Sequence, residues 1–152
     1  MKRSKLEIGS FFINFMGFYI LVMSLLWIFA TEIMFVSDFE VFTGTTYAQY
    51  LASPGNQIYA QIYIITKKLI GFIFLATGIF VLSISYKSYR KGEKWSWYAL
   101  LIGGSIPWAT FIIYKIFIGY YGGSMVVFVI GAVLLVVGLV FPAKEMLRKK
   151  SG

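Results

Sequence analysis

Four long apolar runs dominate this chain, and each run carries three small residues at intervals of seven. Seven residues are about two turns of an α-helix, so each trio lies along one stripe of its helix. Because lipid tails are as apolar as leucine, helices in a membrane associate by close packing, which small residues allow. The pattern predicts an all-α fold, a left-handed bundle of four membrane helices. The small residues expected at the helix contacts are Gly17, Ser24, Thr31, Gly71, Gly78, Ser85, Ser96, Gly103, Thr110, Ser124, Gly131 and Gly138.

The apolar runs are long enough to cross a bilayer. They cover residues 11–35, 62–86, 95–118 and 124–141, and a membrane span needs about 20 mainly apolar residues. Only 13% of the 152 residues are charged, against about 25% in a soluble domain. We therefore expect one membrane domain, residues 1–152. The first run is too long for a signal peptide, and no small-residue cleavage pattern follows it.

Lysine and arginine are concentrated at the amino end, at the carboxyl end and between the second and third runs. With four spans these three segments lie on one side of the membrane, and the positive-inside rule places that side in the cytoplasm. We expect a multi-pass protein of the cell membrane with both termini cytoplasmic. The basic segments either set this topology or bind anionic lipid, and they do not indicate nucleic acid.

Only one connection between the runs is long, the outer loop at residues 36–61. Within it, Thr46 and Gln49 have the spacing of a capping box, and Pro54 follows. We expect a short outer helix at residues 47–52. Because the other connections are short, neighbouring helices should be antiparallel, in an up-down-up-down order.

Pro107 lies inside the third run, four residues after Gly103. Proline removes one helical hydrogen bond and clashes with the carbonyl four residues earlier, so we expect a kink at residues 103–107. The kink either adjusts the shape of the helix or marks a broken helix that lines a cavity.

Four charged residues are expected at one depth, near the outer edge of the hydrocarbon: Glu32, Lys67, Lys68 and Lys115. In one interpretation Glu32 pairs with one lysine, and the others hold an anion, a lipid head group or an acidic partner residue. In the other, each lysine extends separately to the interface with its stem in lipid. Asn14 is the amide of the first span, and we expect it to bond to another helix.

The chain has no cysteine and no histidine, and it shows no buried pair of carboxylates. It therefore lacks the usual thiol and imidazole ligands for metals and the usual acid–base groups of enzymes. We predict no catalytic residues, no metal site and no cofactor. The 30 aromatic residues could line a lipid or quinone pocket, although such side chains more often face lipid.

Two motifs resemble those of a loose group of uncharacterised small four-span membrane proteins of archaea and bacteria. One is the Phe-Thr-Gly sequence at residues 42–44 of the outer loop, and the other is the basic-Gly-Glu-basic-Trp turn at residues 91–95. The resemblance covers about residues 42–100 by motif, and the rest of the chain by its pattern of spans. It implies a four-span fold and no known activity.

These observations lead to three hypotheses of function. The first is a non-catalytic accessory or structural subunit of a larger membrane enzyme complex, respiratory or oxygen-using. The second is a homo-oligomeric transporter or channel for a small solute or anion. The third is a membrane protein that binds lipid or quinone. The expected partners are membrane lipids and other integral membrane subunits or further copies of the chain.

Overall fold

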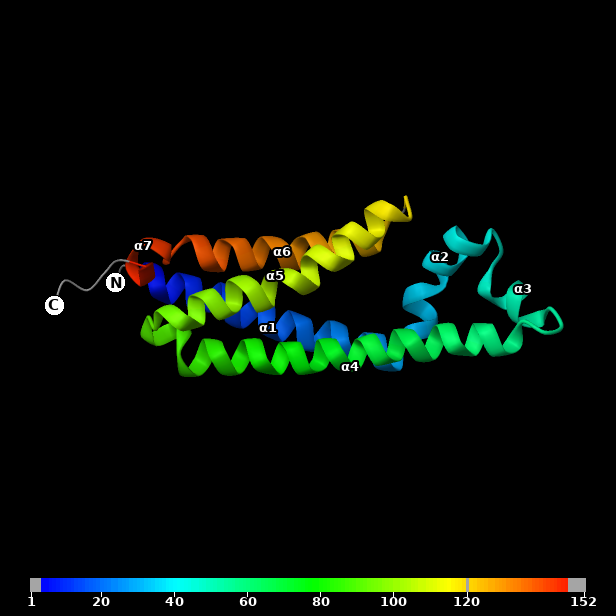
Figure 1. Ribbon diagram of the computed structural model, residues 1–152, viewed down its shortest axis with the longest axis horizontal. Coiled ribbons are helices and arrows are strands. Elements are labelled where there is room, and N and C mark those ends of the chain that lie inside the picture. The colour runs from blue at the N-terminus through cyan, green and yellow to red at the C-terminus, as the bar shows by residue number, and fades with distance from the viewer. Residues whose placement is uncertain (1–3, 120, 148–152) are drawn as a thin grey trace.

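The computed structural model describes residues 4–119 and 121–147, and every regular element in these ranges is a helix (Figure 1). The prediction of an all-α chain is therefore confirmed. Four helices are long and apolar enough to cross a membrane, and they indicate a multi-pass membrane protein. The elements in chain order are α1 (Lys5–Phe29), α2 (Thr31–Thr43), α3 (Tyr47–Ala52), α4 (Gln57–Lys87), the 3₁₀ helix η1 (Tyr89–Lys91), α5 (Lys94–Phe117), α6 (Gly123–Val140) and α7 (Ala143–Leu147).

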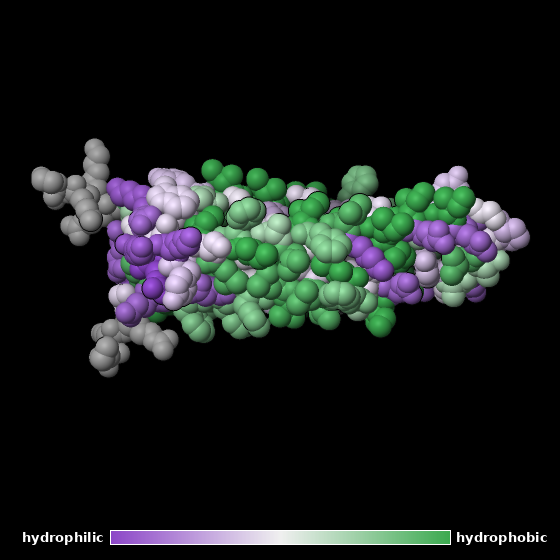
Figure 2. All heavy atoms as spheres, turned by 90° about the horizontal axis from the view of Figure 1, so that it is seen from below, coloured by the Kyte–Doolittle hydropathy of each residue, from purple (hydrophilic) through white to green (hydrophobic). Residues whose placement is uncertain are grey.

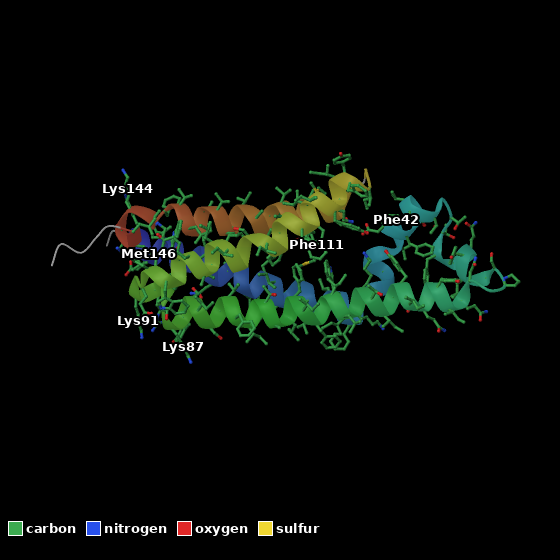
Figure 3. All side chains as sticks on the ribbon, viewed as in Figure 1. Phe42, Lys87, Lys91, Phe111, Lys144 and Met146 are labelled. Carbon is green, nitrogen blue, oxygen red and sulfur yellow. The ribbon has the colours of Figure 1, made fainter. Side chains whose placement is uncertain are left out.

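The four long helices lie side by side, and each contacts two of the others. Helix α1 packs along α4 and α6, and α5 packs mainly on α6 and more loosely on α4. Lys87, Lys91 and Lys144 extend from the same end of the molecule, the basic end (Figure 3). The opposite, distal end carries α2 and α3, and there α5 diverges from α4 (Figure 1). Between the two ends runs a hydrophobic band, as a membrane protein requires (Figure 2).

Helices α1 and α4 approach closely because glycines leave room for larger side chains. A Cβ atom added to Gly78 would lie 2.8 Å from a methyl carbon of Leu21, and one on Gly17 would lie 2.8 Å from Leu82. A Cβ atom added to Gly71 would lie 2.9 Å from Ile28. The contact therefore depends on glycine at these positions. The other small residues expected in the first two spans are also buried: Ser24 on α1, Ser85 on α4, and Thr31, which begins α2.

Helix α6 uses glycine in the same way. Gly131 lies beneath the ring of Trp108, and Gly138 lies against Ile13, whose methyl carbon would be 2.6 Å from an added Cβ. Ser124 is half-buried. These contacts join α6 to α5 at one level and to α1 at another.

Helix α5 does not follow the expected stripe of seven. Of that trio only Ser96 is buried, whereas Gly103 and Thr110 are exposed, and nothing lies within 4 Å of a Cβ added to Gly103. Gly104 faces the bundle instead, 3.0 Å from Leu135 by the same measure. The reason is that α5 buries a ridge with a spacing of four: Ser96, Leu100, Gly104 and Trp108. This ridge packs on α6, where Gly104 meets Leu135 and Trp108 meets Gly131.

Side chains of η1 and of α5 replace helical hydrogen bonds that are missing where a proline follows α6. Pro142 has no N–H group, so the carbonyl of Gly138 lacks its usual helical partner. The buried Tyr89 of η1 donates its hydroxyl proton to that carbonyl over 2.6 Å, and Trp97 donates to the next carbonyl, of Leu139, over 3.0 Å. Two aromatic side chains thereby donate hydrogen bonds to two carbonyl groups near the end of α6.

Two boundaries differ from the predicted runs. The first span ends at Phe29, because Ala30 leaves the helical conformation (φ −117°, ψ 28°), and the chain continues as α2 rather than as a straight span to residue 35. Most of the expected loop 36–61 is helical, since α2 extends to Thr43 and α4 begins at Gln57. Helix α5 continues through Pro107 without a break.

The short helix in this connection lies where the sequence predicted it, at Tyr47–Ala52, and its capping box is confirmed. The hydroxyl of Thr46 accepts a hydrogen bond from the Gln49 amide (3.1 Å). The Gln49 side chain accepts one from the Thr46 amide (3.2 Å).

Candidate functional site

Helix α2 carries three side chains that join it to two long helices at the distal end. The ring of Phe39 lies 5.1 Å from that of Tyr63 on α4, measured between centroids. The ring of Phe42, labelled in Figure 3, lies 6.1 Å from that of Tyr114 on α5. The third side chain, Asp38, pairs with Lys115 on α5. Helix α2 therefore spans the opening where α4 and α5 diverge.

The ion pair between Asp38 and Lys115 is almost completely buried, with both side chains 1% exposed. One carboxylate oxygen accepts the hydrogen bond from Lys115, and the other, Oδ2, has no hydrogen-bond partner among the described residues. The sequence analysis missed Asp38, because it placed residue 38 in an exposed loop. The available signal was the apolar pattern, which continues to Phe42 and so extends the helix past residue 35.

Lys67 lies beside this pair, and its side chain is 9% exposed. Its ammonium lies 5.2 Å from the ring centroid of Tyr63 and 5.1 Å from that of Tyr114, and 3.5 Å from the Tyr114 hydroxyl. Such contacts with aromatic faces stabilise a cation. It is also within electrostatic reach of Asp38 and Lys115. We call these five residues the charge cluster: Asp38, Tyr63, Lys67, Tyr114 and Lys115.

The structure separates the four charged residues that the sequence placed together. Lys67 and Lys115 turn inward and join the charge cluster. Glu32 and Lys68 are exposed and line a separate pocket at the junction of α1 and α2. Consecutive residues on a helix point about 100° apart, so Lys67 and Lys68 cannot both face the interior. The expected single cluster is therefore wrong.

Two hydroxyl groups, one in α1 and one just after it, bond to the backbone of α1. Ser24 donates to the carbonyl of Ile20 over 2.6 Å, and Thr31, the first residue of α2, donates to that of Trp27. Hydroxyl groups in helices commonly bond backward in this way. Asn14 lines a shallow groove with Leu82 and Ser83, and makes no hydrogen bond to any described residue. The predicted bond from Asn14 to another helix is therefore wrong.

A layer of aromatic rings fills the interior of the bundle next to the charge cluster, on the side toward the basic end. Trp27 lies 5.1 Å from Phe74 and 5.0 Å from Phe111 between ring centroids, and Phe111 stacks on Phe128 at 4.8 Å. Trp108 lies 6.0 Å from Phe74. We call these five residues the aromatic layer, to which α1, α4, α5 and α6 all contribute. Each such pair contributes about 0.5–1.5 kcal/mol beyond its buried area.

The chemistry available to the charge cluster follows from its composition. Among residues 4–119 and 121–147, no group of three or more acidic side chains could hold a metal ion. In its ordinary ionisation states the cluster has two cations and one anion, so it suits anions better than cations. The pair Asp38–Lys115 also fixes α2 in position, because separating it would leave a buried charge without a partner.

After comparison with known proteins, the resemblance to small four-span membrane proteins stays a prediction. No protein-family model, curated protein sequence or solved structure matches the chain.

Proposed function

We propose that this protein is a non-catalytic integral membrane protein that serves as a small accessory subunit of a larger membrane enzyme complex, respiratory or oxygen-using. In this proposal its four long helices form an antiparallel, left-handed bundle in the cell membrane. The basic end, with both termini, lies in the cytoplasm, because Lys87, Lys91 and Lys144 gather there.

The aromatic layer is the observation that carries this proposal. Trp27, Phe74, Trp108 and Phe128 are each at most 5% exposed, and the rings come from all four long helices. A filled interior at this level leaves no route for a solute through a single copy of the chain. The protein would therefore act through its outer surface, where every long helix exposes large apolar side chains: phenylalanine on α1, phenylalanine and isoleucine on α4 and α5, and mainly valine on α6. Such surfaces contact lipid or other membrane subunits.

The test is gentle solubilisation of the tagged protein from its native membranes, followed by size separation and identification of the co-migrating chains. We expect a large assembly that contains the subunits of a membrane enzyme. The same sample dissociated in sodium dodecyl sulfate marks the position of the free chain. Migration of the gently solubilised protein only at that position would count against the proposal.

The orientation has a separate test. Tags accessible only from the cytoplasm should react at both chain ends. Tags on opposite faces of the membrane would exclude the proposed topology, whatever the result for the complex.

A second candidate function is a homo-oligomeric carrier or channel for a small anion. The observation that favours it is the excess of positive charge in the charge cluster, where Lys67 and Lys115 lie with the single carboxylate of Asp38. The pathway would lie between copies, since the aromatic layer fills each bundle. Purified protein in liposomes should then conduct chloride or a small carboxylate.

The substitution Lys67→Met should abolish such anion flux, because it removes the cation that faces Tyr63 and Tyr114. Its matched control is Lys68→Met, which removes the neighbouring exposed lysine outside the cluster. Equal flux in the wild-type protein and in Lys67→Met would remove this candidate.

A further inference from the structure

A pocket of about 210 Å³ lies at the junction of α1 and α2, apart from the charge cluster. At about 30 Å³ for each water molecule, this volume suits a small polar group. The pocket lies at the end of the first candidate span, which stops at Phe29, so it is at the level of lipid head groups if that span crosses the membrane. Its lining residues are Phe29, Ala30, Thr31, Glu32, Ile33 and Lys68.

The pocket presents two opposite charges. Glu32 and Lys68 are both exposed, and neither forms an ion pair or a hydrogen bond with any described residue. A free carboxylate and a free ammonium on one pocket suit a ligand that carries both charges. Such a ligand would place its anionic group on Lys68 and its cationic group on Glu32.

Apolar side chains flank these charges. Phe29 is 82% exposed and Ile33 is 85% exposed, and both line the same pocket. Their exposure is unfavourable in water and favourable beside acyl chains. The combination of a polar pocket and two free apolar side chains therefore selects an amphiphile with a zwitterionic head.

The two zwitterionic head groups that are common in phospholipids differ in their donors. A primary ammonium donates hydrogen bonds to a carboxylate, whereas a quaternary ammonium cannot and is usually held in a cage of several aromatic rings. This pocket offers the carboxylate of Glu32 and one aromatic side chain, Phe29. It therefore favours the primary ammonium.

We propose that this pocket binds the head group of a phosphatidylethanolamine-type lipid, with the phosphate on Lys68 and the primary ammonium on Glu32. The acyl chains lie along Phe29 and Ile33. This inference rests on the proposed insertion in a membrane and does not depend on the accessory role.

Native mass spectrometry of the purified protein from nanodiscs tests it. The nanodiscs contain equal amounts of phosphatidylethanolamine, phosphatidylcholine and phosphatidylglycerol. We expect the wild-type protein to retain phosphatidylethanolamine with a preference of about threefold to fivefold, the factor for one partly exposed charge pair. Lys68→Met should lose this retention, and Glu32→Gln should lose the preference over phosphatidylglycerol.

Two variants serve as matched controls. Glu40→Gln removes another exposed carboxylate on α2, and Lys87→Met removes an exposed lysine at the other end of α4. Both should keep the preference for phosphatidylethanolamine. The inference is overturned if wild-type protein shows no such preference, if it prefers phosphatidylglycerol, or if Glu40→Gln acts like Glu32→Gln. Because the isolated chain is measured, failure here is distinct from failure to find an enzyme complex.

Discussion

The carboxylate of Asp38 and the ammonium of Lys115, 77 residues apart in sequence, form an ion pair in which both side chains are buried from solvent. The pair joins α2 to α5 where the long helices diverge. The position of α2 therefore depends on both residues together.

Replacing Asp38 with asparagine should strongly destabilise the protein. The substitution leaves the ammonium of Lys115 buried without its counter-ion, and breaking a buried pair in this way costs about 3–5 kcal/mol. Unfolding in detergent, followed by circular dichroism, measures the change. Glu40→Gln, an exposed position on the same helix, should change stability by less than about 0.5 kcal/mol. Equal stability of Asp38→Asn and wild type would show that the pair does not hold α2.

The two buried lysines should differ in their effect on stability. Lys115→Met removes the ion-pair partner of the buried Asp38 carboxylate and should cost about 3–5 kcal/mol, like Asp38→Asn. Lys67→Met removes a cation that is held by aromatic rings and leaves the ion pair intact, so it should cost about 1 kcal/mol or less. The same unfolding measurement compares them. If Lys67→Met were the more damaging, Asp38 would depend mainly on Lys67.

Gly131→Ala should destabilise the bundle, because the added methyl group would overlap the six-membered ring of Trp108. Overpacking of this kind costs about 1–3 kcal/mol. The matched control is Gly103→Ala on α5, where nothing lies within 4 Å of the added atom. That control should be neutral or stabilise the helix by up to about 1 kcal/mol. Thermal unfolding of both variants in one detergent decides between these positions.

Tyr89→Phe should destabilise the end of α6. The substitution removes the hydroxyl that donates to the Gly138 carbonyl and leaves this acceptor buried, which costs about 1–3 kcal/mol. Tyr86→Phe, an exposed tyrosine one turn earlier, should leave stability unchanged. Hydrogen exchange of the amides near Pro142 gives a local measure. Unchanged protection in Tyr89→Phe would mean that another group satisfies this carbonyl.

The turn before α5 should respond to acid. Hydrogen bonds from Ser88 and then from the Trp95 indole lower the pKa of Glu93 below its ordinary value of 4.5, and the indole bond is 2.7 Å long. Because the pKa of Glu93 is lower in the folded state, the charged carboxylate stabilises the folded turn. This stabilisation is present above about pH 4.5 and is lost as the pH falls through the pKa of Glu93 in the folded protein. The indole N–H resonance of Trp95 should therefore move only below pH 4.5. Glu93→Gln should abolish the movement.

Much of the fold could be predicted because it depends on local patterns. Long apolar runs must form helices wherever backbone groups lack water. The capping box of Thr46 and Gln49 involves residues three apart, so it can be recognised without knowing the rest of the chain. Glycines on α1 and α4 also lie at the helix contact as their spacing of seven indicates.

The candidate site depended on tertiary structure. Whether Gly103 or Gly104 faces the bundle is a rotation of 100° about α5, and the sequence contains small residues on both faces. The pairing of Asp38 with Lys115 requires the chain to turn at Ala30, where no proline or glycine marks the break.

The sequence by itself therefore determined that the chain is helical, that four helices are apolar enough to span a membrane, and that basic residues gather at one end. Only the tertiary structure decided which charges are buried together, that Lys67 and Lys115 join Asp38, and that Glu32 and Lys68 form a separate pocket. The physical reason is range: helix formation and capping act within a few residues along the chain. The pairing of buried charges is decided by the rotation and tilt of helices that are distant in sequence.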